Sequence, residues 1–313
     1  MTASTDFRVH PGAIVVACEK GGAGKTSFAA NLGAALGASD YGVLMVDLDA
    51  QGNLNGELNA REHPQFDNGE SLAAAIADYA PLVEPTIRDV KSNIDLVCGG
   101  SALGAIVDDT AKLVENPKII ADILQPLVFG DRDYDYVVID TPPNSRFMQA
   151  AMVAARGLVI PLSTDSESTR SLGLMGEWIA EVEQHNPWLT LLGVFQSNVD
   201  VRSAPWKEQS AFLQENFPHA FIDHPIRHSV AALRARQAGL QAIEFLDAAK
   251  IAKAQRFQAL KRHKKGERFA PSAKSLGDPK AAATLAQDYL NVIGVVIERL
   301  IAINETDNYG IES

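Results

Sequence analysis

Short, uninterrupted apolar runs alternate with amphipathic stretches along most of the chain. Continuous apolar runs are typical of strands that are covered on both faces, and apolar residues three or four positions apart indicate helices that bury one face. The pattern predicts strands at 13–18, 43–47, 94–97, 136–140, 157–161 and 191–196. It predicts helices at 25–36, 71–77, 117–124, 147–155, 168–183, 205–216, 230–238 and 281–303.

This alternation predicts an α/β fold with a mostly parallel, twisted sheet and helices on both faces. The 313 residues, of which 46% are hydrophobic, are enough to bury such a core. We find no internal repeat and no clear linker, so we expect a single domain over 1–313. No apolar run approaches the roughly 20 residues that span a bilayer, and 1–11 lack a signal-peptide core. Cys18 and Cys98 have no metal-type spacing, which favours unpaired thiols in a reducing cytoplasm.

The chain is acidic overall, with a net charge of −11, but one segment is strongly basic. Between residues 250 and 280, ten lysines and arginines are opposed only by Glu267 and Asp278, which gives a local balance of +8. Such charge separation favours a surface that binds a polyanion. A solvated helix followed by a loop explains the same composition. We interpret 250–280 as a basic insertion before the C-terminal helix.

The most specific chemical signal is the run E-K-G-G-A-G-K-T-S from Glu19 to Ser27, between the first strand and the first helix. Glycines let backbone N–H groups converge on phosphate oxygens, and the following helix points its positive dipole end at the same anion. We therefore expect a nucleoside triphosphate here, with Lys25 on the β- and γ-phosphates and the Thr26 hydroxyl on Mg²⁺. A glycine-rich turn with two surface lysines is the alternative. The expected nucleotide contacts are Gly21, Gly22, Ala23, Gly24, Lys25, Thr26 and Ser27.

Three carboxylates follow two other predicted strands. Asp47 and Asp49 come at the end of the second strand, on the same side of the chain, and Asp140 ends the strand at 136–140. Ligands of parallel α/β sheets bind at the carboxyl ends of the strands, so we expect these groups to meet the phosphate loop. Asp140 would hold Mg²⁺ through water and so neutralise charge on the β- and γ-phosphate oxygens.

These residues together resemble the ParA/MinD family of deviant Walker A P-loop ATPases, and ParA-type partition ATPases in particular, over about 13–245. The loop has the family's K-G-G-x-G-K-T form, with an early lysine at Lys20 and no glycine at the first position of the ordinary box, Glu19. The segment D-L-D-A-Q-G-N resembles the family's D-x-D-P-Q-G-N, except that Ala50 replaces the usual proline. The D-T-P-P run that begins at Asp140 also matches.

The resemblance implies an ATPase that uses ATP and Mg²⁺ and forms a homodimer when ATP is bound. Lys20 would reach the partner's nucleotide, Asp49 would orient or activate the attacking water, and Asp47 would help to hold the Mg²⁺ shell. A lysine supplied in trans would make hydrolysis weak without association. The segments 193–202 and 225–239 resemble the family's adenine-side loops. They place the base near Ser197, Asn198 and Pro225.

The resemblance also implies partition of a plasmid, a chromosome region or another cargo by a cytoplasmic, nucleoid-associated protein. DNA binding would go through phosphates, without sequence preference and with strong salt dependence. A ParB-like protein or cargo adaptor would stimulate hydrolysis. The expected DNA contacts are Arg227, Arg234 and Arg236 from the resemblance, and Lys261, Arg262, Lys264 and Lys265 from the basic segment. Arg234 and Arg236 fit equally well as solvated helix charges.

Four alternatives stay open. A MinD-like membrane-positioning ATPase would need a basic amphipathic C-terminal helix, whereas the tail at 304–313 is acidic and polar, so we do not expect a membrane partner. A nitrogenase-type reductase would need paired cysteines for an iron–sulfur cluster. A metabolic P-loop enzyme that phosphorylates a small acid would need a substrate pocket. An adaptor that only senses ATP would follow if Asp49 is misplaced.

Overall fold

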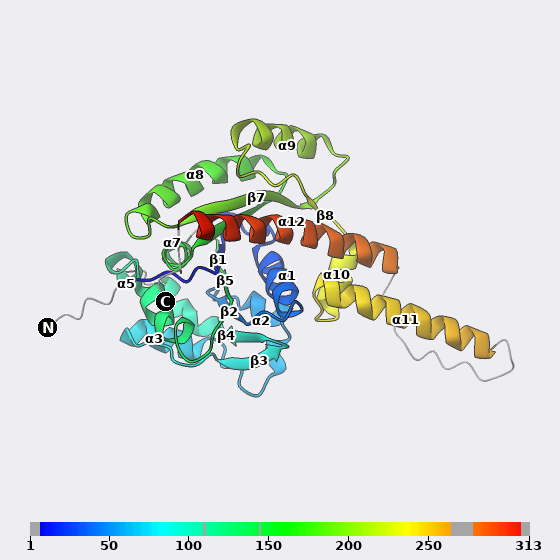
Figure 1. Ribbon diagram of the computed structural model, residues 1–313, viewed down its shortest axis with the longest axis horizontal. Helices are drawn as coiled ribbons and strands as arrows, with labels where there is room; N and C mark the ends of the chain where they lie inside the picture. The colour runs from blue at the N-terminus through cyan, green and yellow to red at the C-terminus, as the bar shows by residue number, and fades with distance from the viewer. Residues whose placement is uncertain (1–6, 109–110, 144, 264–277, 308–313) are drawn as a thin grey trace.

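The apolar runs form one sheet of eight strands in the described part of the chain, in the order β3-β4-β2-β5-β1-β6-β7-β8 (Figure 1). All neighbours pair in parallel except β3 and β4, which are antiparallel. The computed structural model describes residues 7–108, 111–143, 145–263 and 278–307. The strands are β1 (Ala13–Val16), β2 (Val43–Asp47), β3 (Ile87–Lys91), β4 (Ile94–Val97), β5 (Tyr136–Asp140), β6 (Gly157–Leu162), β7 (Thr190–Val199) and β8 (Ile226–Arg227).

Helices alternate with these strands and vary widely in length. Two short 3₁₀ helices, η1 (Ala60–Glu62) and η2 (Ser101–Leu103), accompany them. The α-helices are α1 (Lys25–Gly37), α2 (Asn53–Glu57), α3 (Glu70–Asp78), α4 (Gly104–Asp108), α5 (Ala111–Glu115), α6 (Ile119–Val128), α7 (Arg146–Val153), α8 (Ser166–Glu183), α9 (Ala204–Asn216), α10 (Val230–Gln237), α11 (Ala242–His263) and α12 (Pro279–Thr306).

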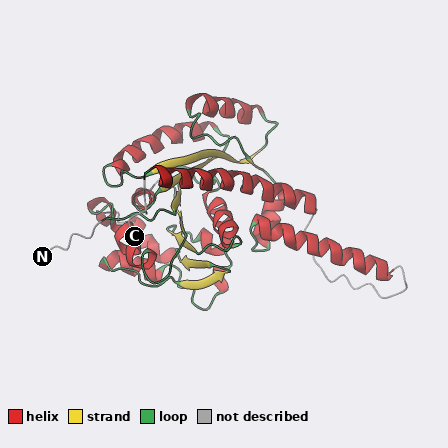
Figure 2. Cartoon of the chain, in the orientation of Figure 1, coloured by secondary structure: helices red, strands yellow, loops and turns green. Residues whose placement is uncertain are grey.

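The helices cover both faces of the sheet (Figure 2). Val15 and Val137 lie in the core beneath α3, α6, α7 and α8, whereas Ile14 and Val138 lie in the core beneath α1, α11 and α12. Successive side chains of a strand point to opposite faces, so a strand between two helical layers is apolar at every position. This burial explains the continuous apolar runs, and the predicted fold class is confirmed.

The elements that the sequence did not predict have no clear repeat of apolar residues. Strand β3 lies at the edge of the sheet, buries only its first residue, Ile87, and carries charges, and β8 has two residues. Helices α2, α4 and α5 have five residues each, too few for a helical repeat. Each predicted strand and helix has a counterpart, with ends shifted by a few residues.

Helix α11 carries the beginning of the basic segment, for which a solvated helix was one interpretation, but its part before Lys250 went unpredicted. It starts at Ala242, runs to His263 and extends away from the rest of the molecule (Figure 1). Its amino-terminal part packs on the core through Phe245 and Ala249. The remainder of the basic segment up to residue 277 lies outside the described residues.

Candidate nucleotide site

The glycine-rich loop joins the end of β1 to α1 at the carboxyl edge of the sheet. Gly22 and Gly24 have φ angles of 79° and 89°, in the left-handed region that favours glycine. A β-carbon on Gly24 would also lie 2.6 Å from the Ser197 hydroxyl oxygen at the end of β7. The loop therefore depends on glycine both for its conformation and for its close approach to a neighbouring strand.

Lys25 is the first residue of α1, and its side chain is buried within the loop. The residue is only 6% exposed, and its Nζ donates a hydrogen bond to the Lys20 carbonyl oxygen at 3.1 Å. Burial lowers the pKa of Lys25, while the nearby Cys18, Asp140 and Asp49 side chains oppose that shift. An anion in the loop would provide the counter-charge that this buried ammonium group requires.

Two buried carboxylates stand side by side next to the loop. Asp47 and Asp140 are register partners at the ends of β2 and β5, and both are fully buried. Burial raises the pKa of both groups, that of Asp140 to about 7, and in Asp47 the adjacent Asp140 charge adds to the increase. The Asp47 carboxylate accepts the N–H groups of Asp49 at 3.0 Å and Leu54 at 3.2 Å. Asp47 thereby anchors the loop that follows β2.

Asp140, in contrast, has no hydrogen-bond partner for either carboxylate oxygen within the described residues. The Thr26 hydroxyl, Lys25 and the Thr141 N–H nevertheless lie close enough to lower its pKa against the effect of burial. An unpartnered buried carboxylate beside a hydroxyl suits a hydrated divalent cation. No group of three or more His, Cys, Asp or Glu side chains forms a metal site in the described part of the chain. Asp140 and Thr26 would hold Mg²⁺ together with phosphate and water.

The loop from Asp49 to Gly52 is held by several hydrogen bonds. The Asp49 carboxylate accepts the Gln51 N–H at 2.9 Å, and the Asp49 carbonyl accepts the N–H groups of Gly52 and Gly100. A β-carbon on Gly99 would lie 2.6 Å and 2.8 Å from the carbonyl oxygens of Asp47 and Asp49. Gly99 and Gly100, which sequence reasoning missed, let the chain after β4 pass directly against this loop. The Gly-Gly pair at the end of a predicted strand was the available signal.

Lys20 is paired within its own chain. Its Nζ lies 2.5 Å from a carboxylate oxygen of Asp165, which precedes α8. The preceding residue, Glu19, accepts a hydrogen bond from the Trp178 indole of α8 at 3.1 Å. The start of the loop is therefore fastened to α8, and the side chains of Lys20 and Asp165 remain 27% and 41% exposed. No pattern in the sequence around Asp165 indicated its pairing with Lys20.

The residues expected near the base lie together at the same edge of the sheet. Ser197 is buried against Gly24, Asn198 is exposed with a φ of 58°, and Pro225 immediately precedes β8. Strands β7 and β8 bring them together, because Ser197 pairs with Ile226. This grouping agrees with the expected placement of a base beside the loop, and the contact itself stays a prediction.

Two of the three arginines expected to contact DNA take part in ion pairs. Arg227 donates from Nε and Nη2 to the buried Asp288 of α12, and Arg236 donates to Glu57 and to the hydroxyl of Ser27. Arg234 is exposed on α10. Of the expected basic-segment contacts, Lys261 and Arg262 fall at the end of α11 without described side chains, and Lys264 and Lys265 lie outside the described residues.

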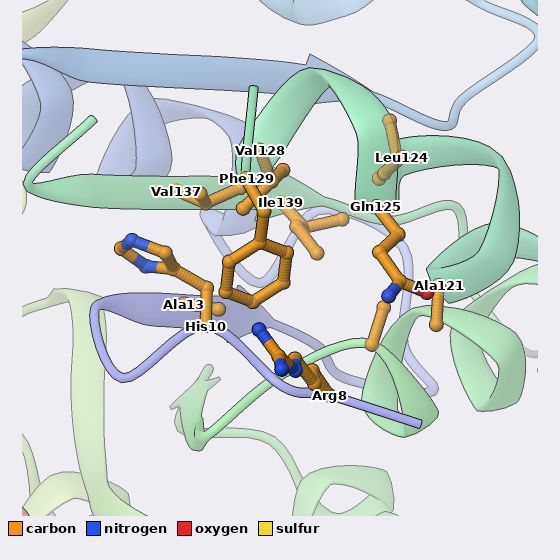
Figure 3. Close-up of a pocket in the computed structure, with 11 residues that line it drawn as sticks. Arg8, His10, Ala13, Ala121, Leu124, Gln125, Val128, Phe129, Val137 and Ile139 are labelled. Carbon is orange, nitrogen blue, oxygen red and sulfur yellow. The ribbon is translucent and has the colours of Figure 1, made fainter. Parts of the chain in front are cut away.

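A small apolar pocket opens at the opposite, amino-terminal edge of the sheet (Figure 3). Arg8, His10 and Phe129 surround it, together with Ala13, the first residue of β1. Burial lowers the pKa of His10, whose Nδ1 accepts the Gly12 N–H at 3.1 Å. The phosphate loop follows the other end of β1, so this pocket is separate from the candidate nucleotide site.

Comparison with known proteins finds relatives that match the part of the chain that builds this site. A family model described as an AAA domain matches residues 12–191, which include the loop, Asp47, Asp49 and Asp140. The ParA family protein of Chlamydia muridarum is 30% identical over 229 residues, which cover 69% of this chain and 84% of that protein. The chromosome partitioning protein ParA of Caulobacter vibrioides is 26% identical over 228 residues, which cover 72% of this chain and 84% of that protein.

Solved structures share the fold. An ATP complex of McdA from Cyanothece matches with a TM-score of 0.64 at 26% identity, covering 76% of this chain and 91% of that one. Cobyrinic acid a,c-diamide synthase from Mycobacterium smegmatis, with bound ADP and magnesium, matches with a TM-score of 0.58 at 26% identity. That match covers 84% of this chain and 98% of that one.

The close contact of Gly99 with the Asp47–Asp49 backbone gives a first prediction. Gly99→Ala would force this backbone apart, so we expect a loss of about 1–3 kcal/mol in unfolding free energy by urea titration. We also expect weaker binding of a fluorescent ATP analogue. Gly176→Ala is the matched control, because its β-carbon meets nothing within 4 Å in α8. Equal stability and equal affinity in the two variants would contradict the proposed constraint.

Proposed function

Because the chain belongs to the ParA/MinD family of P-loop ATPases, we propose that it hydrolyses ATP and forms a homodimer when ATP and Mg²⁺ are bound. The observation that carries this proposal is the unpartnered, buried Asp140 between Lys25, Thr26 and Asp47. A cation would stabilise the ionised form of this carboxyl group, and an anion would stabilise the buried Lys25 ammonium group. A triphosphate with its Mg²⁺ supplies both.

The side chains then have distinct roles in the proposed reaction. Lys25 holds the β- and γ-phosphates, Asp49 orients the attacking water, and Thr26, Asp47 and Asp140 hold the shell of the cation. Mg²⁺, when bound, neutralises charge on the phosphate oxygens. The nucleotide also contacts the backbone of the glycine loop, and its base lies beside the end of β7.

Lys20 makes hydrolysis depend on association in this proposal. To reach the partner's phosphates, it must leave Asp165. A cation that arrives with a second subunit stabilises transition-state charge much as an arginine finger does, so the single subunit hydrolyses ATP weakly. A ParB-like protein or cargo adaptor would stimulate the reaction and so dissolve the dimer.

We further propose that the ATP dimer binds DNA nonspecifically and acts in partition of a plasmid, a chromosome region or another cargo. Two observations support this extension: a relative is named as a chromosome partitioning protein, and the acidic chain carries one strongly basic segment. Elements from residue 13 to residue 306 build one sheet and its two helical layers, so we propose a single ATPase domain.

Two other uses of the same site are separable by experiment. The likeness to cobyrinic acid a,c-diamide synthase favours, as a second candidate, an ATP-dependent enzyme that acts on a small molecule. ATP hydrolysis that depends on a small acid and ignores DNA would support that candidate. For membrane positioning, no helix in the described residues is long and apolar enough to cross a bilayer. Sedimentation with anionic liposomes tests attachment through the basic segment instead.

Lys20→Ala tests the shared site. In sedimentation velocity, we expect the wild type to dimerise with ATP and Mg²⁺ but not with ADP, and Lys20→Ala to stay monomeric with both. The control is Lys207→Ala, which removes an exposed lysine of α9. ATP-dependent dimers of Lys20→Ala, or dimers of the wild type that form equally with ADP, would refute the proposal.

The fourfold variant Lys261→Glu, Arg262→Glu, Lys264→Glu and Lys265→Glu tests the basic segment. We expect weaker DNA binding, and a slope of log affinity against log salt that is smaller by up to about 4, since each lost phosphate contact removes about 0.9. Fluorescence anisotropy with two unrelated duplexes measures both quantities. The pair Arg202→Glu and Lys207→Glu, near the start of α9, is the control. Unchanged binding by the fourfold variant at low salt would exclude this segment.

A further inference from the structure

Three polar side chains from three helices form a closed triangle behind the phosphate loop. Ser27 lies in the first turn of α1, Glu57 ends α2, and Arg236 lies in the last turn of α10. The Ser27 hydroxyl donates to the Glu57 Oε1 at 3.1 Å and accepts from the Arg236 Nη2 at 2.6 Å. The Arg236 Nε donates to the same Glu57 oxygen at 2.7 Å. Each member therefore contacts the other two.

The backbone around this triangle is fastened as well. The Gln241 side chain donates to the Glu57 carbonyl at 2.6 Å, and the Asn59 side chain donates to the Gly239 carbonyl at 2.8 Å. Gly239 has a φ of 64°, and a β-carbon there would lie about 2 Å from the Asn59 side chain. The corner between α10 and α11 is thus held tightly against α2 and η1.

Helix α2 is also attached to the nucleotide side. It begins directly after the Asp47–Gly52 loop, and the Asp47 carboxylate accepts the N–H of Leu54 at 3.2 Å. With only five residues, α2 joins this loop at one end to Glu57 at the other. A shift of the loop would therefore move Glu57 relative to α10.

We propose that Glu57 and Arg236 are positioning residues that couple the nucleotide site to α10 and α11. The inference rests on the proposed function, because the coupled ligand is ATP. Glu57 contacts α1 through the Ser27 hydroxyl and is joined to the Asp47–Gly52 loop through α2. Arg236 links Glu57 to α10. The helices that this coupling reaches include α11, whose outer end carries part of the basic segment.

The positive charge of Arg236 should also affect phosphate binding at the candidate nucleotide site. The Glu57 side chain is only 10% exposed and sits beside the helix end that would receive a triphosphate, whereas Arg236 is 62% exposed. Arg236 neutralises this carboxylate. Without it, an almost buried negative charge would remain near the phosphates and disfavour their binding. Removal of the Glu57 charge should therefore compensate for the loss of Arg236.

A double-mutant cycle on ATP-analogue affinity tests this charge balance. We expect Arg236→Ala to weaken affinity about tenfold, within the range usual for coupled sites. We expect Arg236→Lys, which keeps the charge, to bind nearly as the wild type does, and Arg236→Ala with Glu57→Gln to recover most of the loss. Thermal melts check that each variant folds. A double variant that binds no better than Arg236→Ala would overturn the charge balance.

Hydrogen exchange of the amides at 230–242, with and without the ATP analogue, tests the coupling itself. We expect the analogue to change exchange in the wild type, and Glu57→Ala, which removes the acceptor for both Ser27 and Arg236, to bind it without that change. Lys91→Gln is the matched control, because it breaks the 2.7 Å Lys91–Glu244 pair, which holds the start of α11 to β3. This control should keep the response.

The outcomes separate the two levels of the proposal. ATP binding by the wild type with no change in exchange at 230–242 would overturn the coupling alone. A response that persists in Glu57→Ala, or that disappears equally in Lys91→Gln, would do the same. A wild type that binds no ATP would overturn the proposed function, and the coupling with it.

Discussion

The structure depends on the burial of two carboxylates side by side at the carboxyl edge of a parallel sheet. Asp47 and Asp140 are register partners on adjacent strands, and neither has access to solvent. Burial of an ionised carboxylate costs several kcal/mol unless it is paired. Asp47 meets this requirement with two backbone N–H groups, whereas Asp140 has no hydrogen-bond partner among the described residues. The apolar strands around them hold this unfavourable arrangement in place.

The Lys25 ammonium group beside Asp140 is likewise a buried charge without a counter-ion in direct contact in the described part of the chain. Lys25 is a buried cation that donates to the backbone of its own loop, and burial lowers its pKa. The Asp140 carboxylate and the Lys25 ammonium group thus lie close together without a direct hydrogen bond, and Thr26 lies beside them. Titratable groups whose pKa values are shifted by burial and by neighbouring charges cluster at functional sites. The buried charges of both signs favour binding of a phosphate together with a cation. This is the basis of the proposed function.

The sequence predicted the central strands and the phosphate loop because local physics determines both. A strand that is buried on both faces is apolar at each position, and the loop requires glycine at Gly22 and Gly24 whatever surrounds it. The contacts of Ser27 and Arg236 could not be predicted in this way, because their partners lie far apart in sequence. In the sequence, Arg236 is indistinguishable from an exposed helix charge, and only the tertiary structure brings it to Glu57. The same holds for Lys20 and Asp165.

The central claim is that Asp140 provides the site for a cation that accompanies ATP. Isothermal titration of ATP, with and without Mg²⁺, tests it most directly when the wild type is compared with Asp140→Asn. The account predicts that Mg²⁺ tightens ATP binding to the wild type by about tenfold or more and has little effect on Asp140→Asn. It also predicts that the variant alone is at least as stable as the wild type, since it lacks a buried charge. An equal effect of Mg²⁺ on the two proteins would contradict the account.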